Sequence, residues 1–98
     1  MRVLFRPEAR AEILEAKEWY EASVPGLGLE FARALDAAVQ SAARMPLAFP
    51  SIDGECRRVL LRRFPFSVIY RVAADRLLVV AVFHHRREPG KWSGRTGG

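Results

Sequence analysis

The stretch His84-His85-Arg86-Arg87-Glu88 brings together the side-chain types that acid–base chemistry on RNA requires. A nuclease without a metal needs a base for the ribose 2′-OH, an acid for the leaving 5′-oxygen and cations for the charge on phosphorus. Acid and base could come from His84, His85 and Glu88, and the charge from Arg58, Arg62, Arg71 and Arg86. Histidine is also common at strand ends where it has no functional role. The segment could therefore instead bind a polyanion, or only keep the end of the chain soluble.

Other kinds of chemistry have less support in the sequence. His84 and His85 are neighbours in an expected strand, so they point to opposite faces and cannot share a metal ion. Nothing marks Cys56 as an activated thiol. Gly26 and Gly28 stand between two expected helices rather than after a strand, so they form no phosphate loop. We therefore expect no metal and no cofactor.

Composition and charge describe a small basic domain. The chain has 98 residues, of which 50% are hydrophobic, enough for one core, and a net charge of +5. Residues 51–98 carry ten basic and four acidic residues, so the excess lies in the second half, and fourteen of the sixteen basic residues are arginine. Arginine favours bidentate contacts with carboxylate or phosphate, which suggests nucleic acid or an acidic protein as partner. The lone Cys56, the lack of a signal-peptide pattern and the lack of a long apolar run predict a cytoplasmic protein.

The periodicity of apolar residues predicts the elements that position these side chains. Residues 2–5 are expected to form a strand, residues 7–22 a helix and residues 27–45 a second helix packed on the first. Residues 46–55 are expected to form a loop, and three strands should begin near residues 56, 66 and 76. The fold class is therefore α+β, in the order β-α-α-β-β-β, with a helical hairpin on one face of a mainly antiparallel sheet. We expect one domain, residues 1–92, followed by a flexible tail, residues 93–98.

The last strand is apolar on both faces, which is unusual for a sheet covered on one side only. Strict alternation places Leu78, Val80 and Val82 on one face and Leu77, Val79, Ala81 and Phe83 on the other. Leu60 and Ile69 could extend the uncovered face, so we expect an exposed apolar patch that marks a partner site. Alternatively, Phe49 and Ile52 of the loop fold over that face.

Three segments in this order resemble the RelE/ParE superfamily of bacterial toxins. They are the opening "RPEARAEILEAKEWYE", the strand "RRFPFSVIYRV" and the ending "DRLLVVAVFHHRREPGKW". The resemblance covers the chain from about Arg2 to Trp92. It implies the RelE/ParE toxin fold and a toxin of a type II toxin–antitoxin module, a plasmid-stabilising or growth-arresting protein that a cognate antitoxin neutralises.

The superfamily divides by target. RelE-like members cut mRNA on the ribosome, whereas ParE-like members poison DNA gyrase and lack the nuclease residues. Of the positions that resemble the nuclease set, only Arg58 and Arg86 carry matching residues, while Leu60, Ser67 and Trp92 depart from it. The resemblance therefore implies a ParE-like gyrase inhibitor with no chemistry of its own. The alternative is a ribosome-dependent, metal-independent mRNA endonuclease, and a third possibility is a member that binds an antitoxin but has lost toxicity.

Each functional interpretation predicts a different set of site residues. For binding to gyrase the candidates are Arg62, Arg63, Arg86, Arg87 and Trp92. For binding to the antitoxin they are Leu60, Ile69, Val79 and Ala81. If the protein is a nuclease, the catalytic candidates are His84, His85, Arg58 and Arg86.

Overall fold

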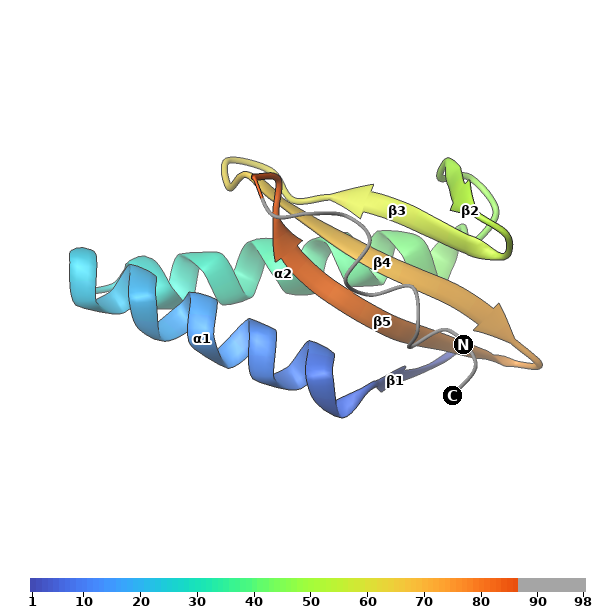
Figure 1. The fold of residues 1–98 in the computed structure, drawn as a ribbon, viewed down its shortest axis with the longest axis horizontal. Coiled ribbons are helices and arrows are strands. Elements are labelled where there is room, and N and C mark those ends of the chain that lie inside the picture. Colours follow the sequence, from blue (N-terminus) through green and yellow to red (C-terminus); the bar gives the residue numbers. More distant parts are fainter. Residues whose placement is uncertain (87–98) are drawn as a thin grey trace.

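Two helices pack on one face of a five-stranded sheet in the computed structural model, which describes residues 1–86 (Figure 1). The strand order is β1-β5-β4-β3-β2, and only β1 and β5 run parallel. In chain order the elements are β1 (Arg2–Phe5), α1 (Pro7–Ser23), α2 (Leu27–Arg44), β2 (Ser51–Asp53), β3 (Cys56–Leu60), β4 (Phe66–Ala73) and β5 (Arg76–His84). The predicted α+β class is confirmed, and the predicted order β-α-α-β-β-β holds with one short strand added, β2, between α2 and β3. No helix in this part of the chain is long and apolar enough to cross a membrane.

One predicted boundary is wrong. Residues 46–55 were expected to be loop, but residues Ser51–Asp53 form the edge strand β2 and pair with Cys56 and Arg57. The turn between β2 and β3 contains Gly54 at φ 56°, a left-handed conformation that glycine adopts without strain. The Asp-Gly pair that signalled a loop therefore makes a hairpin turn.

The two helices are joined by a connection that Glu21 holds in place. Gly26 starts α2 at φ 92° and has no side chain to cap the helix. Instead, the carboxylate of Glu21 in α1 accepts hydrogen bonds from the N–H groups of Gly26 and Gly28, both at 3.0 Å. A Cβ on Gly28 would lie 2.8 Å from the carbonyl oxygen of Lys17, so the close approach of the helices requires glycine here. Both glycines thus have a structural role.

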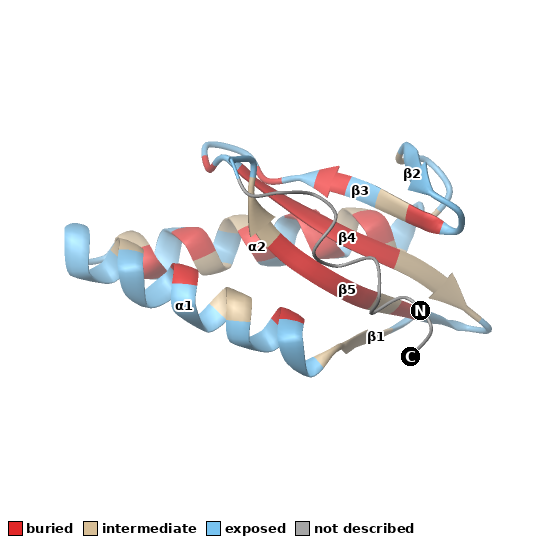
Figure 2. Cartoon of the chain, viewed as in Figure 1, coloured by how far each residue is buried: buried red, intermediate tan, exposed pale blue. Residues whose placement is uncertain are grey.

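The main core lies between the helices and the sheet, where buried residues line the facing surfaces (Figure 2). Its centre is aromatic. The ring of Phe31 lies 5.4 Å from Tyr20, 5.4 Å from Phe64 and 5.0 Å from Phe66, measured between ring centroids. Such edge and offset contacts add to the hydrophobic gain. Phe49 also packs against this core and contacts Tyr70, so it does not cover the opposite face as the alternative supposed.

A bulge in β5 changes which side chains share a face. Ile69 pairs with Ala81 but Tyr70 pairs with Val79, so Val80 has no partner in β4. An extra residue of this kind interrupts the two-residue alternation. Val79 and Val82 consequently both face the helices, together with Leu77, whereas Val80 and Ala81 both face away. The predicted grouping of Val82 with Val80, and of Ala81 with Val79, is wrong for this reason.

The sheet face opposite the helices, here called the open face, carries a second apolar cluster. Cys56, Ile69, Val80 and Ala81 form it, and half-buried Leu78 and Phe83 pack against it. Ile69 and Ala81 are 0% exposed, so the expected exposed patch is wrong for these two residues. Leu60, by contrast, is 52% exposed.

Candidate functional site

The turn between β3 and β4 and the end of β5 meet at one end of the sheet. The backbone N–H of His85 donates to the carbonyl of Pro65 at 2.9 Å, and Phe66 pairs with His84. This contact brings Arg62, Arg63 and Arg86 to the same end, all of them exposed. We call these three arginines the basic end. The structure thus brings together three of the five residues predicted to bind a target, although Arg86 lies more than twenty positions from Arg62 and Arg63 in the sequence.

Local backbone geometry explains why these arginines point outward. Arg63 has a φ of 69°, which is unusual for a residue with a Cβ and carries a cost of order 1 kcal/mol. The N–H of Phe66 closes a tight turn on the carbonyl of Phe64 at 2.8 Å. Because Phe64 inserts into the core, the turn leaves Arg62 and Arg63 on the outside. Arg63 forms an ion pair with Glu30 at 3.8 Å, which is solvent-exposed and therefore weak.

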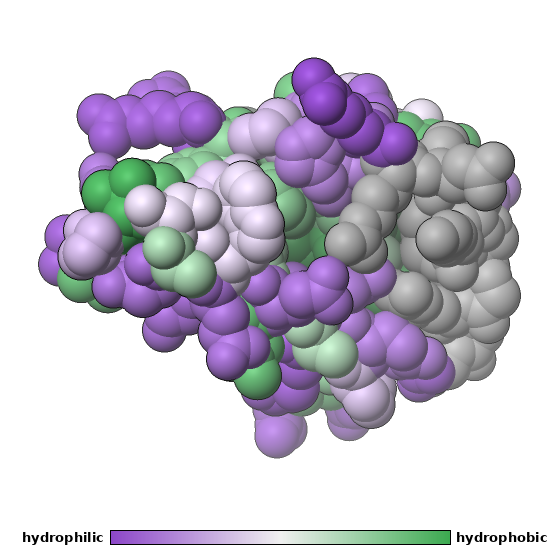
Figure 3. Space-filling view, turned by 60° about the vertical axis from the view of Figure 1, so that its left-hand side comes forward, coloured by the Kyte–Doolittle hydropathy of each residue, from purple (hydrophilic) through white to green (hydrophobic). Residues whose placement is uncertain are grey.

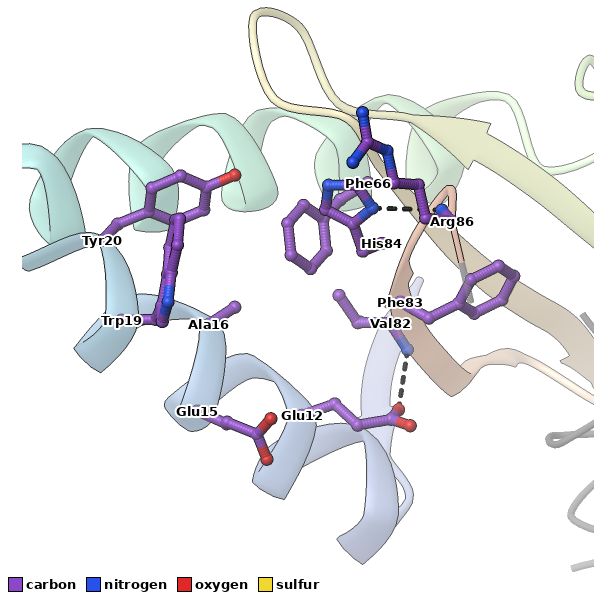
Figure 4. Close-up of a pocket in the computed structure, with 10 residues that line it drawn as sticks. All are labelled: Glu12, Glu15, Ala16, Trp19, Tyr20, Phe66, Val82, Phe83, His84 and Arg86. Atoms are coloured by element: carbon purple, nitrogen blue, oxygen red, sulfur yellow. Dashed lines mark hydrogen bonds between the residues drawn. The ribbon is translucent and has the colours of Figure 1, made fainter. Parts of the chain in front are cut away.

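A pocket of about 570 Å³ lies beside the basic end, between α1 and the end of β5. Figure 3 shows a hollow with an apolar floor on this face, and Figure 4 shows the side chains that line it. One wall carries Glu12, Glu15, Ala16, Trp19 and Tyr20, and the other carries Phe66, Val82, Phe83, His84 and Arg86. The lining of the pocket thus includes two carboxylates of α1 and a histidine and an arginine at the end of β5.

His84 is held at the rim of this pocket by two contacts. Its ring stands edge-on to Phe66, with 5.3 Å between centroids. Its Nδ1 accepts a hydrogen bond from the backbone N–H of Arg86 at 3.0 Å. A nitrogen that accepts in this way carries no proton, so neutral His84 has its proton on Nε2. The Nδ1 atom of His84 is thus occupied by a hydrogen bond within the turn that follows β5.

The nuclease candidates do not gather in one place. His84 pairs with Phe66 and lies on the helix side of the sheet, whereas Arg58 pairs with Ile69 and belongs to the open face. His85 is exposed beyond the end of β5. Of the four candidates, only His84 and Arg86 line the same pocket. Within residues 1–86, no group of three or more His, Cys, Asp or Glu side chains could hold a metal ion.

The residues predicted to bind the antitoxin also lie in different parts of the structure. Leu60 pairs with Ser67 and Ile69 with Ala81, which puts all of them on the open face. Val79 instead packs in the core beneath the helices. Among the four, Leu60 is the one with a substantially exposed side chain, because Ile69, Val79 and Ala81 are each 0% exposed. Arg87, Glu88 and Trp92 lie outside the described residues.

Cys56 is buried on the open face, with 1% of its surface exposed. Burial raises the pKa of its thiol; Asp53 and Glu55 raise it further, and Arg71 opposes them. A nucleophilic thiol needs a lowered pKa and access to solvent, and Cys56 has neither.

The residues that α1 contributes to the pocket are not among those predicted from the sequence. Glu12, Glu15 and Trp19 follow one another at spacings of three and four, which places them on one side of a helix. This spacing is visible in the sequence, but the predicted orientation of the helix rests on its apolar stripe alone. Which residues face the strand end is decided by the packing of α1 along β5.

Comparison with known proteins identifies the family. The model of the family described as "ParE toxin of type II toxin-antitoxin system, parDE" matches residues 3–89. The chain belongs to the ParE toxin family. As a ParE toxin it is the toxin component of a type II toxin–antitoxin module, and its partner is an antitoxin. No sequence among curated proteins matches it.

A solved structure supports the same fold for this ParE toxin. The chromosomal ParDE toxin–antitoxin system from P. aeruginosa superimposes with a TM-score of 0.73 and 20% sequence identity. The match covers 86% of this chain and 95% of the other. The family match confirms the predicted membership in the RelE/ParE superfamily, and the solved structure supports the predicted fold.

Proposed function

We propose that this ParE toxin inhibits DNA gyrase by binding it through the basic end, without a chemical step of its own. The observation that carries the proposal is the meeting of Arg62, Arg63 and Arg86 around the Pro65–His85 hydrogen bond. Three exposed arginines at one end of a rigid sheet give a positively charged surface for an acidic partner. The other two predicted target-binding residues follow in the sequence, Arg87 directly after Arg86 and Trp92 six positions after it.

The separation of Arg58 from His84 also favours binding over RNA cleavage. A catalytic base and the cation that stabilises the transition state must reach the same phosphate. Two side chains on opposite faces of a sheet cannot do so.

We also propose that the antitoxin contacts Leu60. It is the exposed member of the predicted set, so a partner that covers it gains the free energy of burying its apolar surface.

The test is gyrase supercoiling of relaxed plasmid in the presence of the purified toxin, scoring both inhibition and trapped cleaved DNA. Wild-type toxin should inhibit, and Arg62→Glu with Arg86→Glu should abolish inhibition. The matched control, Arg44→Glu with Arg76→Glu, changes the net charge equally at exposed positions away from the basic end. Full gyrase activity with excess wild-type toxin would overturn the proposal, and so would equal loss in both variants.

The second candidate is a ribosome-dependent mRNA endonuclease. The observation in its favour is that His84 and Arg86 line the same pocket as Glu12 and Glu15 (Figure 4). Acid–base groups in a recess next to a cation are what RNA cleavage requires. Cleavage of mRNA on translating ribosomes, with gyrase unaffected, would establish this candidate instead.

A further inference from the structure

The indole of Trp19 stands at the wall of the pocket between α1 and the end of β5, and 64% of this residue is exposed. The ring lies edge-on to Tyr20, with 5.1 Å between centroids and 82° between planes. Tyr20 is in turn held by the core rings of Phe64 and Phe66, at 4.9 and 6.1 Å. Tryptophan is among the side chains most enriched at the energetic centres of protein interfaces. A supported but exposed Trp19 is therefore a candidate contact residue.

The floor of this pocket is apolar. Ala16, Phe66 and Val82 line it, and each is 8% exposed or less. The volume of about 570 Å³ lies in the range of about 300–1,000 Å³ in which proteins bind small ligands, so the pocket has room for a bulky side chain. A partner that inserts one removes apolar surface from water on both molecules, that of Trp19 included.

The charges of the pocket follow an order along β5. The carboxylate of Glu12 is bound to the backbone N–H of Val82. Two residues further along the strand, the ring of His84 stands against Phe66. Arg86 follows, and it belongs both to the pocket and to the basic end. Along the strand, the pocket thus changes from a carboxylate to aromatic rings and then to arginine.

This order selects the chemistry of an occupant. An apolar side chain fits between the aromatic rings, and carboxylates on one side of it reach the arginines of the basic end. Carboxylates on its other side would come close to Glu12 and Glu15, and like charges brought together at an interface are costly. The pocket therefore fits a segment that has an apolar side chain and is acidic on one side of it.

We propose that this pocket binds an apolar anchor side chain of gyrase, flanked on one side by Asp or Glu residues that contact the basic end. The assignment rests on the proposed function, because the occupant is a segment of the proposed target. It extends the binding site from three arginines to a pocket. Anchors in desolvated pockets dominate binding energy, whereas charges at the rim mainly set orientation and the rate of association. Loss of the pocket should thus weaken inhibition even when every arginine is intact.

The experiment measures the toxin concentration that half-inhibits supercoiling by purified gyrase holoenzyme. Trp19→Ala should raise it by about tenfold, and Trp19→Phe, which keeps an aromatic ring, by no more than about threefold. The matched control is Leu14→Ala, because Leu14 is 57% exposed on the same helix but does not line this pocket. It should change the concentration by no more than about twofold.

The outcomes separate the pocket from the proposed function. Equal inhibition by wild-type toxin and Trp19→Ala overturns the pocket and leaves the basic end as the binding site. An equal loss in Leu14→Ala and Trp19→Ala also overturns the pocket. Full gyrase activity with excess wild-type toxin overturns both proposals.

Photo-crosslinking identifies the occupant without relying on the stability of Trp19→Ala. p-Benzoylphenylalanine in place of Trp19 keeps a large aromatic group at the pocket and should crosslink to gyrase, whereas the same group in place of Leu14 should not. Mass spectrometry of the crosslinked gyrase peptide should find an apolar residue with Asp or Glu beside it. A basic or uncharged peptide, or equal crosslinking from both positions, contradicts the proposal.

Discussion

The carboxylate of Glu12 in α1 accepts a hydrogen bond from the backbone N–H of Val82 in β5 at 3.0 Å, across 70 positions of the sequence. Pairing of β1 with β5 ends at Phe5 and Val79, and the N–H of Arg6 donates to Val79. Beyond that point no described strand covers the outer edge of β5. α1 runs along it, and Glu12 satisfies a backbone donor that would otherwise be part-buried without a partner.

Glu12→Ala should therefore lower the free energy of unfolding by about 1–3 kcal/mol, the cost of leaving such a donor unsatisfied. Glu12→Gln keeps an acceptor oxygen and should cost less. Glu18→Ala, at an exposed position of the same helix, should change stability by less than about 0.5 kcal/mol. Guanidinium denaturation measures all three. Equal stability of the Glu12→Ala and Glu18→Ala variants would show that the hydrogen bond does not matter.

The histidines distinguish binding from catalysis. His84→Phe with His85→Ala keeps an aromatic ring against Phe66 and removes both imidazoles. A toxin that acts by binding gyrase should retain inhibition within about twofold, because the arginines are unchanged. A nuclease should lose activity by about 100-fold or more. Supercoiling and mRNA-cleavage assays on the same preparations decide between the two.

The turn between β4 and β5 contains a strained residue. Ala74 has a φ of 57° in the two-residue connection between Ala73 and Arg76, where glycine is favoured. Ala74→Gly should raise the free energy of unfolding by about 1 kcal/mol. Ala73→Gly, inside the strand, should instead lower it by about 0.5–1 kcal/mol. Thermal or denaturant unfolding of both variants measures the sign of each change in the free energy of unfolding. A lower stability of Ala74→Gly would mean that the flexibility of glycine in the unfolded chain outweighs the relief of strain in the folded chain.

Burial of Cys56 predicts both its reactivity and a dependence of stability on pH. The raised pKa and the buried position should make its thiol react with alkylating reagents much more slowly in the folded protein than in denaturant. Labelling at equal rates in both conditions would contradict this.

The sign of the pH effect follows from proton binding. The folded state keeps the thiol proton longer than the unfolded state, whose thiol titrates near its usual pKa of 9.0. Stability is therefore full below this pH and falls as the pH rises through it. Burial also raises the pKa of Tyr20 and Tyr70 above 10.0, which extends the loss to higher pH. Cys56→Ala should show a shallower loss in denaturation curves between about pH 8 and 10.

The sequence by itself determined the class of the fold and the family. Apolar residues at helical spacing, such as Phe31, Leu35 and Ala38, turned out to be the buried side of α2. Alternation predicted the strands, because helix and strand periods follow from backbone geometry that each segment carries locally. The side-chain type and the resemblance made Arg62, Arg63 and Arg86 candidates for binding a target. The sequence could not show that the three side chains lie at the same end of the sheet.

Tertiary structure alone decided which side chains meet. The bulge at Val80 arises from how β5 pairs with β4, and it moved Val82 to the helix face and Ala81 to the open face. The hydrogen bond from His85 to Pro65 joined two turns into the basic end. Contacts of this kind depend on register and packing between distant segments, and no local pattern encodes them.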